Sequence, residues 1–135
     1  MIYFLIAAIG FGVVVLVLIA VFGKHVHKPM NQSRFEKKWI ELLTRVRTPE
    51  GMILAVIDAD NLLDEALRRR GFKGKTMGER LVAAQNSLTN NDAVWYAHKL
   101  RNRLVHESDA RIKEREAKTA LAGVREGLKD LGALK

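Results

Sequence analysis

The chain has 135 residues, which is enough for one domain with a membrane anchor and too few for two ordinary domains. Its formal net charge is +8, so phosphate-rich partners, either nucleic acid or anionic lipid head groups, would be attracted to it. It contains no cysteine, which excludes thiol chemistry and is compatible with a reducing compartment.

Residues 1–23 carry no charged side chain, whereas all 23 Lys and Arg and all 15 Asp and Glu follow them. Because an apolar helix of about 20 residues crosses the bilayer hydrocarbon, we expect residues 1–23 to form a transmembrane helix. A cleaved signal peptide is the alternative interpretation. It is disfavoured because nothing basic precedes the apolar run, the run is too long, and Val21-Phe22-Gly23 is a poor small-residue cleavage site.

The residues that flank this segment predict its orientation. Five basic residues follow it closely, and none precedes it: Lys24, Lys28, Arg34, Lys37 and Lys38. An excess of Lys and Arg marks the cytoplasmic end of a membrane span. We therefore expect a single-pass protein of the cell membrane, with its N-terminus outside and its remaining residues in the cytoplasm, next to the anionic inner leaflet.

The rest of the chain predicts an all-α fold. Residues 24–33 are polar and contain a proline, which is typical of a juxtamembrane linker. In residues 34–135 the apolar side chains recur at helical spacing, and no alternating strand pattern is present. The sequence therefore predicts an N-terminal transmembrane helix followed by a compact bundle of about five helices.

Capping residues predict where several of these helices begin and end. The first of them is indicated by five apolar residues that share one helix face: Phe35, Trp39, Leu42, Leu43 and Val46. Thr48 and Pro49 suit the start of a second helix, which runs to about Arg70 and stops at Gly71.

The remaining helices have similar markers. Thr76 and Glu79 have the spacing of a capping box, which predicts a shorter helix through Leu88. Asp92 is predicted to cap the next helix, which contains Trp95. A last helix is expected to end near Gly132.

Two short patterns resemble known binding loops but lack residues that those loops require. Gly74-Lys75-Thr76 matches the end of a phosphate-binding loop, but the glycine required five residues earlier is Arg69. The acidic run at residues 58–61 hints at a calcium loop, but Leu62 and Leu63 occupy positions that need a ligand and a glycine. We expect neither a metal site nor a cofactor.

The most informative segment is residues 95–107, where Arg101, Asn102 and His106 lie near the end of a predicted helix. Arginine is a fixed cation suited to phosphate, and histidine can transfer protons near neutral pH. Together these groups could cleave RNA without a metal. A base would take the proton of the ribose 2′-OH while a cation stabilises the charge on the phosphate.

The pattern Arg-Asn-x-x-x-His resembles the signature of the HEPN superfamily (higher eukaryote and prokaryote nucleotide-binding domains), an all-α bundle. The likeness covers roughly residues 35–134, including Leu-Leu-Asp-Glu-Ala-Leu at 62–67, Gly71 and Trp95. Many members are metal-independent endoribonucleases whose Arg and His residues converge across a homodimer interface. Others are inactive binding or dimerisation modules.

The resemblance implies roles for individual residues. Arg101 would bind the scissile phosphate, Asn102 would hold His106 or the phosphate, and His106 would be the general acid or base. Neighbouring basic residues would contribute to substrate binding: His98, Lys99 and Arg103. RNA, the membrane, a second copy of the chain and an unidentified protein antidote or partner are the expected partners.

Two hypotheses follow. In the first, the chain is a membrane-anchored endoribonuclease of toxin or stress-defence type. In the second, it is a non-catalytic helical module that binds a protein partner or anionic lipid, and Arg101 and His106 serve local structure. Arg101 would then pair with Asp92 or Glu107, and Asn102 and His106 would cap the helix. On an ideal helix, Arg101 and His106 lie about 140° apart, so a single-chain site requires the helix to end between them.

Overall fold

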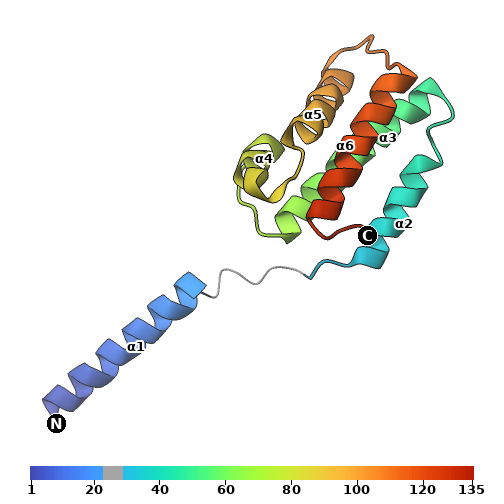
Figure 1. Ribbon diagram of the computed structural model, residues 1–135. Helices are drawn as coiled ribbons and strands as arrows, with labels where there is room; N and C mark the ends of the chain where they lie inside the picture. The colour runs from blue at the N-terminus through green and yellow to red at the C-terminus, as the bar shows by residue number, and fades with distance from the viewer. Residues whose placement is uncertain (23–28) are drawn as a thin grey trace.

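The computed structural model describes residues 1–22 and 29–135, without the side chain of Phe22, and every regular element in these ranges is a helix (Figure 1). The elements in chain order are α1 (Ile2–Phe22), α2 (Gln32–Leu43), α3 (Pro49–Arg69), α4 (Met77–Ala84), a 3₁₀ helix (Gln85–Ser87), α5 (Asn91–His106) and α6 (Glu114–Asp130). The all-α class and the bundle of five α-helices after the apolar segment are therefore confirmed. The first half of the expected linker, residues 24–28, lies outside the described residues, and α2 already includes its last two residues.

Helix α1 is long and apolar enough to cross a membrane. Its mean hydropathy is 3.1 over Ile2–Val21, and the rest of the chain buries none of these residues. A signal sequence near an N-terminus can meet the same criteria of length and apolar composition. The helix therefore fits a membrane segment, and its composition does not distinguish an anchor from a signal sequence.

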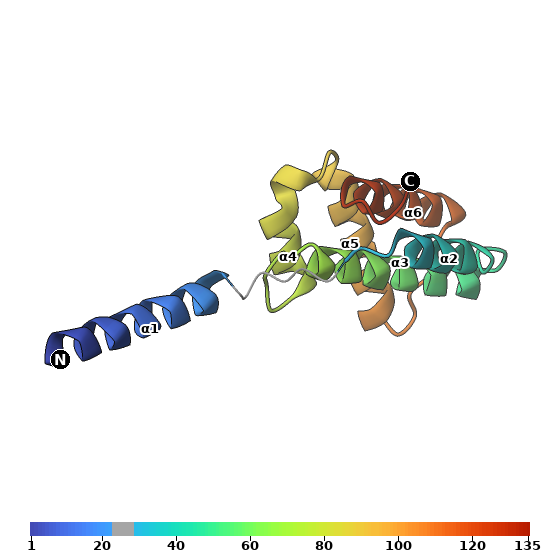
Figure 2. The same cartoon turned by 90° about the horizontal axis from the view of Figure 1, so that it is seen from below.

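Helix α3 is the centre of the bundle and contacts each of the other helices that follow α1. Helices α5 and α6 pack against it and against each other, while α2 lies along it (Figure 1). Figure 2 shows α4 toward the opposite end of α3 from α2. The C-terminal residues lie beside the start of α2, where the Gln32 amide donates to the Gly132 carbonyl at 3.2 Å.

Most of the predicted helix ends are confirmed. The Thr48 hydroxyl accepts from the Gly51 amide at 3.0 Å, and Thr76 accepts from the Glu79 amide at 3.2 Å. Gly71 and Gly132 follow α3 and α6 with φ of 84° and 73°, a conformation that costs glycine little.

Three local predictions were wrong. Asn90 caps α5, accepting from the Ala93 amide at 3.1 Å, whereas Asp92 is the second residue of the helix and its charge interacts favourably with the helix dipole. Helix α4 ends at Ala84 rather than reaching Leu88, because the chain tightens into the 3₁₀ helix. Leu43, predicted to share the inward face of its helix, is 39% exposed and lines an open groove.

Charged side chains join α2 to α3. Glu65 on α3 pairs with Arg34 and, at 3.4 Å, with Lys38 of α2, and also with Arg69 at 3.1 Å. Burial alone would raise the pKa of Glu65. The hydrogen bonds from Arg34 and Arg69 and the charge of Lys38 outweigh that effect and hold the pKa below its ordinary value.

A buried ion pair attaches α4 to α3. The guanidinium of Arg80 donates to both carboxylate oxygens of Asp64, at 2.7 and 3.0 Å, and to the Gly74 carbonyl at 2.6 Å. The Arg80 side chain is only 8% exposed. The sequence predicted a surface pair between Asp64 and Arg68, which is present at 2.6 Å, but did not identify Arg80 as the second partner.

These two arginines give a matched test. Arg80→Ala should lower the free energy of unfolding by about 3 kcal/mol, because Asp64 loses its buried partner. Arg68→Ala should cost less than about 1 kcal/mol, because the Arg68 side chain is 65% exposed. Urea denaturation followed by circular dichroism measures both. Equal losses for the two variants would contradict the assignment of Arg80 as the buried clamp.

Candidate functional site

Helix α5 presents one face to the core and the predicted motif on its other faces. Its buried residues are Val94, Ala97, Leu100 and Leu104. Helix α6 approaches it closely at Gly123, where an added Cβ would lie 2.6 Å from the Ala93 carbonyl oxygen. This close packing fixes how α5 is rotated, and thereby which of its polar side chains turn toward α3.

A buried carboxylate on α3 faces α5. Asp60 is 2% exposed and lies among the apolar core residues of α3. Its oxygens lie 3.1 and 3.2 Å from Nδ1 of His98, and its Oδ2 is 3.6 Å from Nε of Arg101. A buried carboxylate is costly unless it is paired and hydrogen-bonded, and both partners come from the predicted segment.

The motif residues complete a ring of contacts with Asp60. Nδ2 of Asn102 lies 3.3 Å from Nε2 of His98, and Oδ1 of Asn102 accepts from Nη1 of Arg101 at 3.0 Å. The contacts therefore run from Asp60 to His98, Asn102, Arg101 and back to Asp60, and we call these four residues the Asp60 ring. Nε of Arg101 is buried and has no hydrogen-bond partner among the described residues, so charge attraction alone draws it to Asp60.

The Asp60 ring reaches the surface on the side of α5. The side chain of His98 is 12% exposed and that of Arg101 is 27% exposed. The Trp95 ring meets the imidazole edge-on, with the ring centroids 5.9 Å apart. A cation, an amide and an imidazole are therefore held together at one partly exposed position.

The other predicted site residues lie apart from the Asp60 ring. His106 is the last residue of α5 and is exposed, and its side chain forms no hydrogen bond or ion pair with the described residues. Lys99 is exposed as well. Arg103 is bound to α6 and the loop before it, because it donates to Glu116 at 2.9 Å and to the Arg111 carbonyl at 3.2 Å.

Helix α5 is continuous through the whole motif. The helix includes both Arg101 and His106, so it does not end between them, and the two side chains leave it in directions about 140° apart. The expected partners of Arg101, Asp92 and Glu107, are replaced by Asp60. Asn102 contacts side chains of the ring and does not cap the helix.

Sequence analysis did not identify Asp60 as a site residue. A signal was present, because Asp60 lies four residues after Val56 and three before Leu63, and both of these apolar residues are buried on α3. A carboxylate at an inward helical position requires a partner. That reasoning would have predicted a buried acidic group without identifying the residues that bind it.

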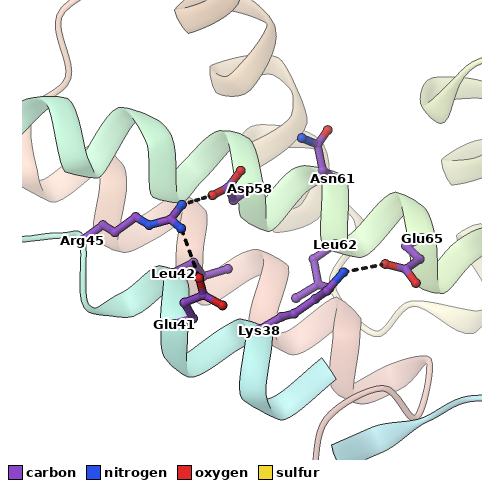
Figure 3. Close-up of a pocket in the computed structure, with 8 residues that line it drawn as sticks. All are labelled: Lys38, Glu41, Leu42, Arg45, Asp58, Asn61, Leu62 and Glu65. Carbon is purple, nitrogen blue, oxygen red and sulfur yellow. Dashed lines mark hydrogen bonds and ion pairs between the residues drawn. The ribbon is translucent and has the colours of Figure 1, made fainter. Parts of the chain in front are cut away.

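Two hollows lie on the α2 side of the bundle. The first, of about 260 Å³, runs between α2 and α3. Figure 3 shows that ion pairs cross it, Lys38 with Glu65 at one end and Arg45 with Glu41 and Asp58 at the other. Because both cations of the lining are paired with carboxylates, this hollow has no excess positive charge to attract a phosphate.

The second hollow is an apolar groove of about 370 Å³ between α2, the start of α3 and α6. Its apolar lining consists of Trp39, Leu43, Val46, Met52, Ala117, Leu121 and Ala122. Charged residues at its margin are Glu114, Lys118 and Arg125. Such a lining suits an apolar side chain or helix face better than a nucleotide.

Among the described residues, no group of three or more His, Asp or Glu side chains is placed to hold a metal ion. No protein-family model matches the chain, and comparison with curated proteins and with solved structures gives no significant match. The geometry of the chain itself therefore carries the functional argument.

The Asp60 ring predicts how much Asp60 contributes to stability. Asp60→Ala should lower the free energy of unfolding by about 1–3 kcal/mol, because it leaves a polar atom of His98 without its partner. Asp58→Ala is the matched control. Its carboxylate is 43% exposed and pairs with Arg45, so its loss should cost less than about 1 kcal/mol. Chemical denaturation of both variants would contradict the ring as a structural link if Asp60→Ala cost no more than Asp58→Ala.

Proposed function

We propose that this chain is a membrane-anchored, metal-independent endoribonuclease with a HEPN-like fold. The observation that carries the proposal is the Asp60 ring, which holds a guanidinium, an amide and an imidazole in mutual contact at a partly exposed position. These are the groups that RNA cleavage without a metal requires. The resemblance of residues 101–106 to the HEPN signature supports the same function.

The proposed reaction is an internal transesterification. A base takes the proton of the ribose 2′-OH, the 2′-oxygen bonds to phosphorus, and the bond from phosphorus to the 5′-oxygen breaks. An acid gives its proton to that 5′-oxygen, so the products are a 2′,3′-cyclic phosphate and a 5′-hydroxyl. Arg101 stabilises the charge on the phosphate, and the motif assigns proton transfer to His106. Lys99, which is exposed, would attract the RNA backbone.

A homodimer fits this proposal better than a single chain. Because α5 is continuous through His106, Arg101 and His106 of one chain do not face a common point. A second copy could place its His106 beside Arg101 of the first. The exposure of His106, and the absence of a partner for it among the described residues, leave it free for such a contact.

In this proposal α1 remains attached and anchors the domain. The basic residues after α1 favour an outside N-terminus and a cytoplasmic bundle, where RNA is present. The attraction of this basic domain to the anionic inner leaflet would hold it close to the membrane.

The topology can be tested because the chain has no native cysteine. Single-cysteine variants at Ile2 and at the exposed Lys129 should differ in their reaction with a membrane-impermeant maleimide. Ile2→Cys should be labelled in intact cells, and Lys129→Cys only after the membrane is permeabilised. The opposite pattern would overturn the orientation, and a soluble chain lacking α1 would show that the segment is a cleaved signal sequence.

The activity can be tested with the full-length chain in detergent micelles, incubated with a mixed-sequence RNA oligonucleotide in EDTA. The parent should yield 2′,3′-cyclic phosphate ends. Arg101→Ala and His106→Ala should each lower kcat by about 100-fold or more, since each removes a group needed in the transition state. Mass spectrometry of the fragments identifies the ends.

The control is Arg125→Ala, which removes a cation from the exposed surface of α6, on the side of the apolar groove. It should cleave at the parental rate. Circular dichroism must show that each variant remains folded. A folded parent that leaves the RNA intact would refute the nuclease proposal, and so would cleavage that persists undiminished in both motif variants.

The second candidate is a non-catalytic module that binds a protein partner at the membrane. The observation that favours it is the apolar groove, whose lining includes the 39%-exposed Leu43. In this case the Asp60 ring would only join α3 to α5. An inactive, folded parent in the assay above would favour this candidate.

A further inference from the structure

The imidazole that shares an anchor with Arg101 is that of His98 rather than that of His106. Both His98 and Arg101 approach the carboxylate of Asp60, at 3.1 Å and 3.6 Å. Asn102 also contacts both of them. His106 takes no part in this arrangement, so within one chain His98 is the titratable group that lies with the proposed phosphate-binding cation.

The neighbours of His98 select one tautomer of its ring. The Asp60 carboxylate can only accept a hydrogen bond, so Nδ1 of His98 must carry a proton. The amide Nδ2 of Asn102 can only donate, so Nε2 of His98 must present a lone pair. The opposite orientation of Asn102 would direct its amide hydrogens at Arg101, which is itself a donor. Both contacts are satisfied by the tautomer that carries its hydrogen on Nδ1 and a lone pair on Nε2.

Substrate can reach this nitrogen if Asn102 moves aside. The contact between Nδ2 of Asn102 and Nε2 of His98 is long, at 3.3 Å, and Asn102 is only partly buried. A ribose hydroxyl is a donor, as the amide is, and can replace it at Nε2. The charged groups in contact with His98 and Arg101 among the described residues are the two side chains themselves and Asp60.

We propose that His98 is the base of the cleavage reaction and that Asp60 is its positioning residue. This inference rests on the proposed ribonuclease function and specifies how its site is divided between two histidines. Nε2 of His98 takes the proton of the 2′-OH as the 2′-oxygen bonds to phosphorus. His106 of a second copy gives a proton to the departing 5′-oxygen. Exchange with water then removes the proton from His98 and restores that of His106.

Asp60 has two effects in this scheme. It holds the ring in the tautomer that leaves Nε2 free of hydrogen, and its negative charge stabilises the imidazolium that forms when the proton arrives. Because the same carboxylate attracts Arg101, the base and the phosphate-binding cation keep a fixed separation.

The test measures cleavage by the full-length chain in micelles, across a range of pH, for the parent and His98→Gln. Glutamine keeps a polar side chain of similar length but cannot take up a proton. His98→Gln should lower kcat by about 100-fold or more with KM changed less than about threefold, and the rise of kcat/KM with pH should disappear. Asp60→Asn should lower kcat and displace that rise along the pH axis. Asp92→Asn, which removes an exposed carboxylate from α5, the helix that carries His98, should match the parent.

The outcomes separate this inference from the function on which it rests. An active parent and an equally active, folded His98→Gln would overturn the role of His98 and leave the ribonuclease intact. An inactive parent would overturn both. If His98→Gln does not fold, nitrogen-15 NMR of the parent still decides. The Nδ1–H tautomer and a His98 titration midpoint that coincides with the rise of kcat/KM support the proposal. Coincidence with the His106 midpoint instead refutes it.

Discussion

The arrangement of this bundle around its motif depends on one constraint, the burial of the Asp60 carboxylate between α3 and α5. A carboxylate that is 2% exposed is desolvated, and hydrogen bonds and positive charge must compensate the free-energy cost of that desolvation. His98 supplies the first and Arg101 the second. Asn102 then joins those two residues to each other. Three polar residues of α5 are fixed by one residue of α3.

This constraint changes how the Arg-Asn-x-x-x-His pattern can work. Arg101 and Asn102 are held in the Asp60 ring, while His106 is exposed at the end of a continuous helix. A single chain therefore offers Arg101 with His98, and a second copy would be needed to bring a His106 to the same point. The proposed division of the reaction between two histidines rests on that separation. An anchored, concentrated chain at the membrane would favour the pairing of two copies.

The rest of the bundle surface is dominated by ion pairs and by one apolar groove. Two cations of α2, Arg34 and Lys38, share one carboxylate of α3, that of Glu65. Exposed pairs of this kind contribute little to stability, whereas the buried pair of Arg80 with Asp64 holds α4 in place. The apolar groove beside α6 is a separate feature and would suit a protein partner whether or not the Asp60 ring is catalytic.

The sequence by itself determined the apolar α1, the helical class and most helix ends, because hydropathy, period and capping act over a few neighbouring residues. Thr48, Thr76, Gly71 and Gly132 mark those ends as predicted. Only the tertiary structure decided which side chains meet. Asp60 and His98 are 38 residues apart, and Asp64 and Arg80 are 16 apart, so their contact depends on how α3 is rotated against α5 and α4. That rotation is set by close packing at many positions at once, such as Gly123 against Ala93, which no short sequence pattern records.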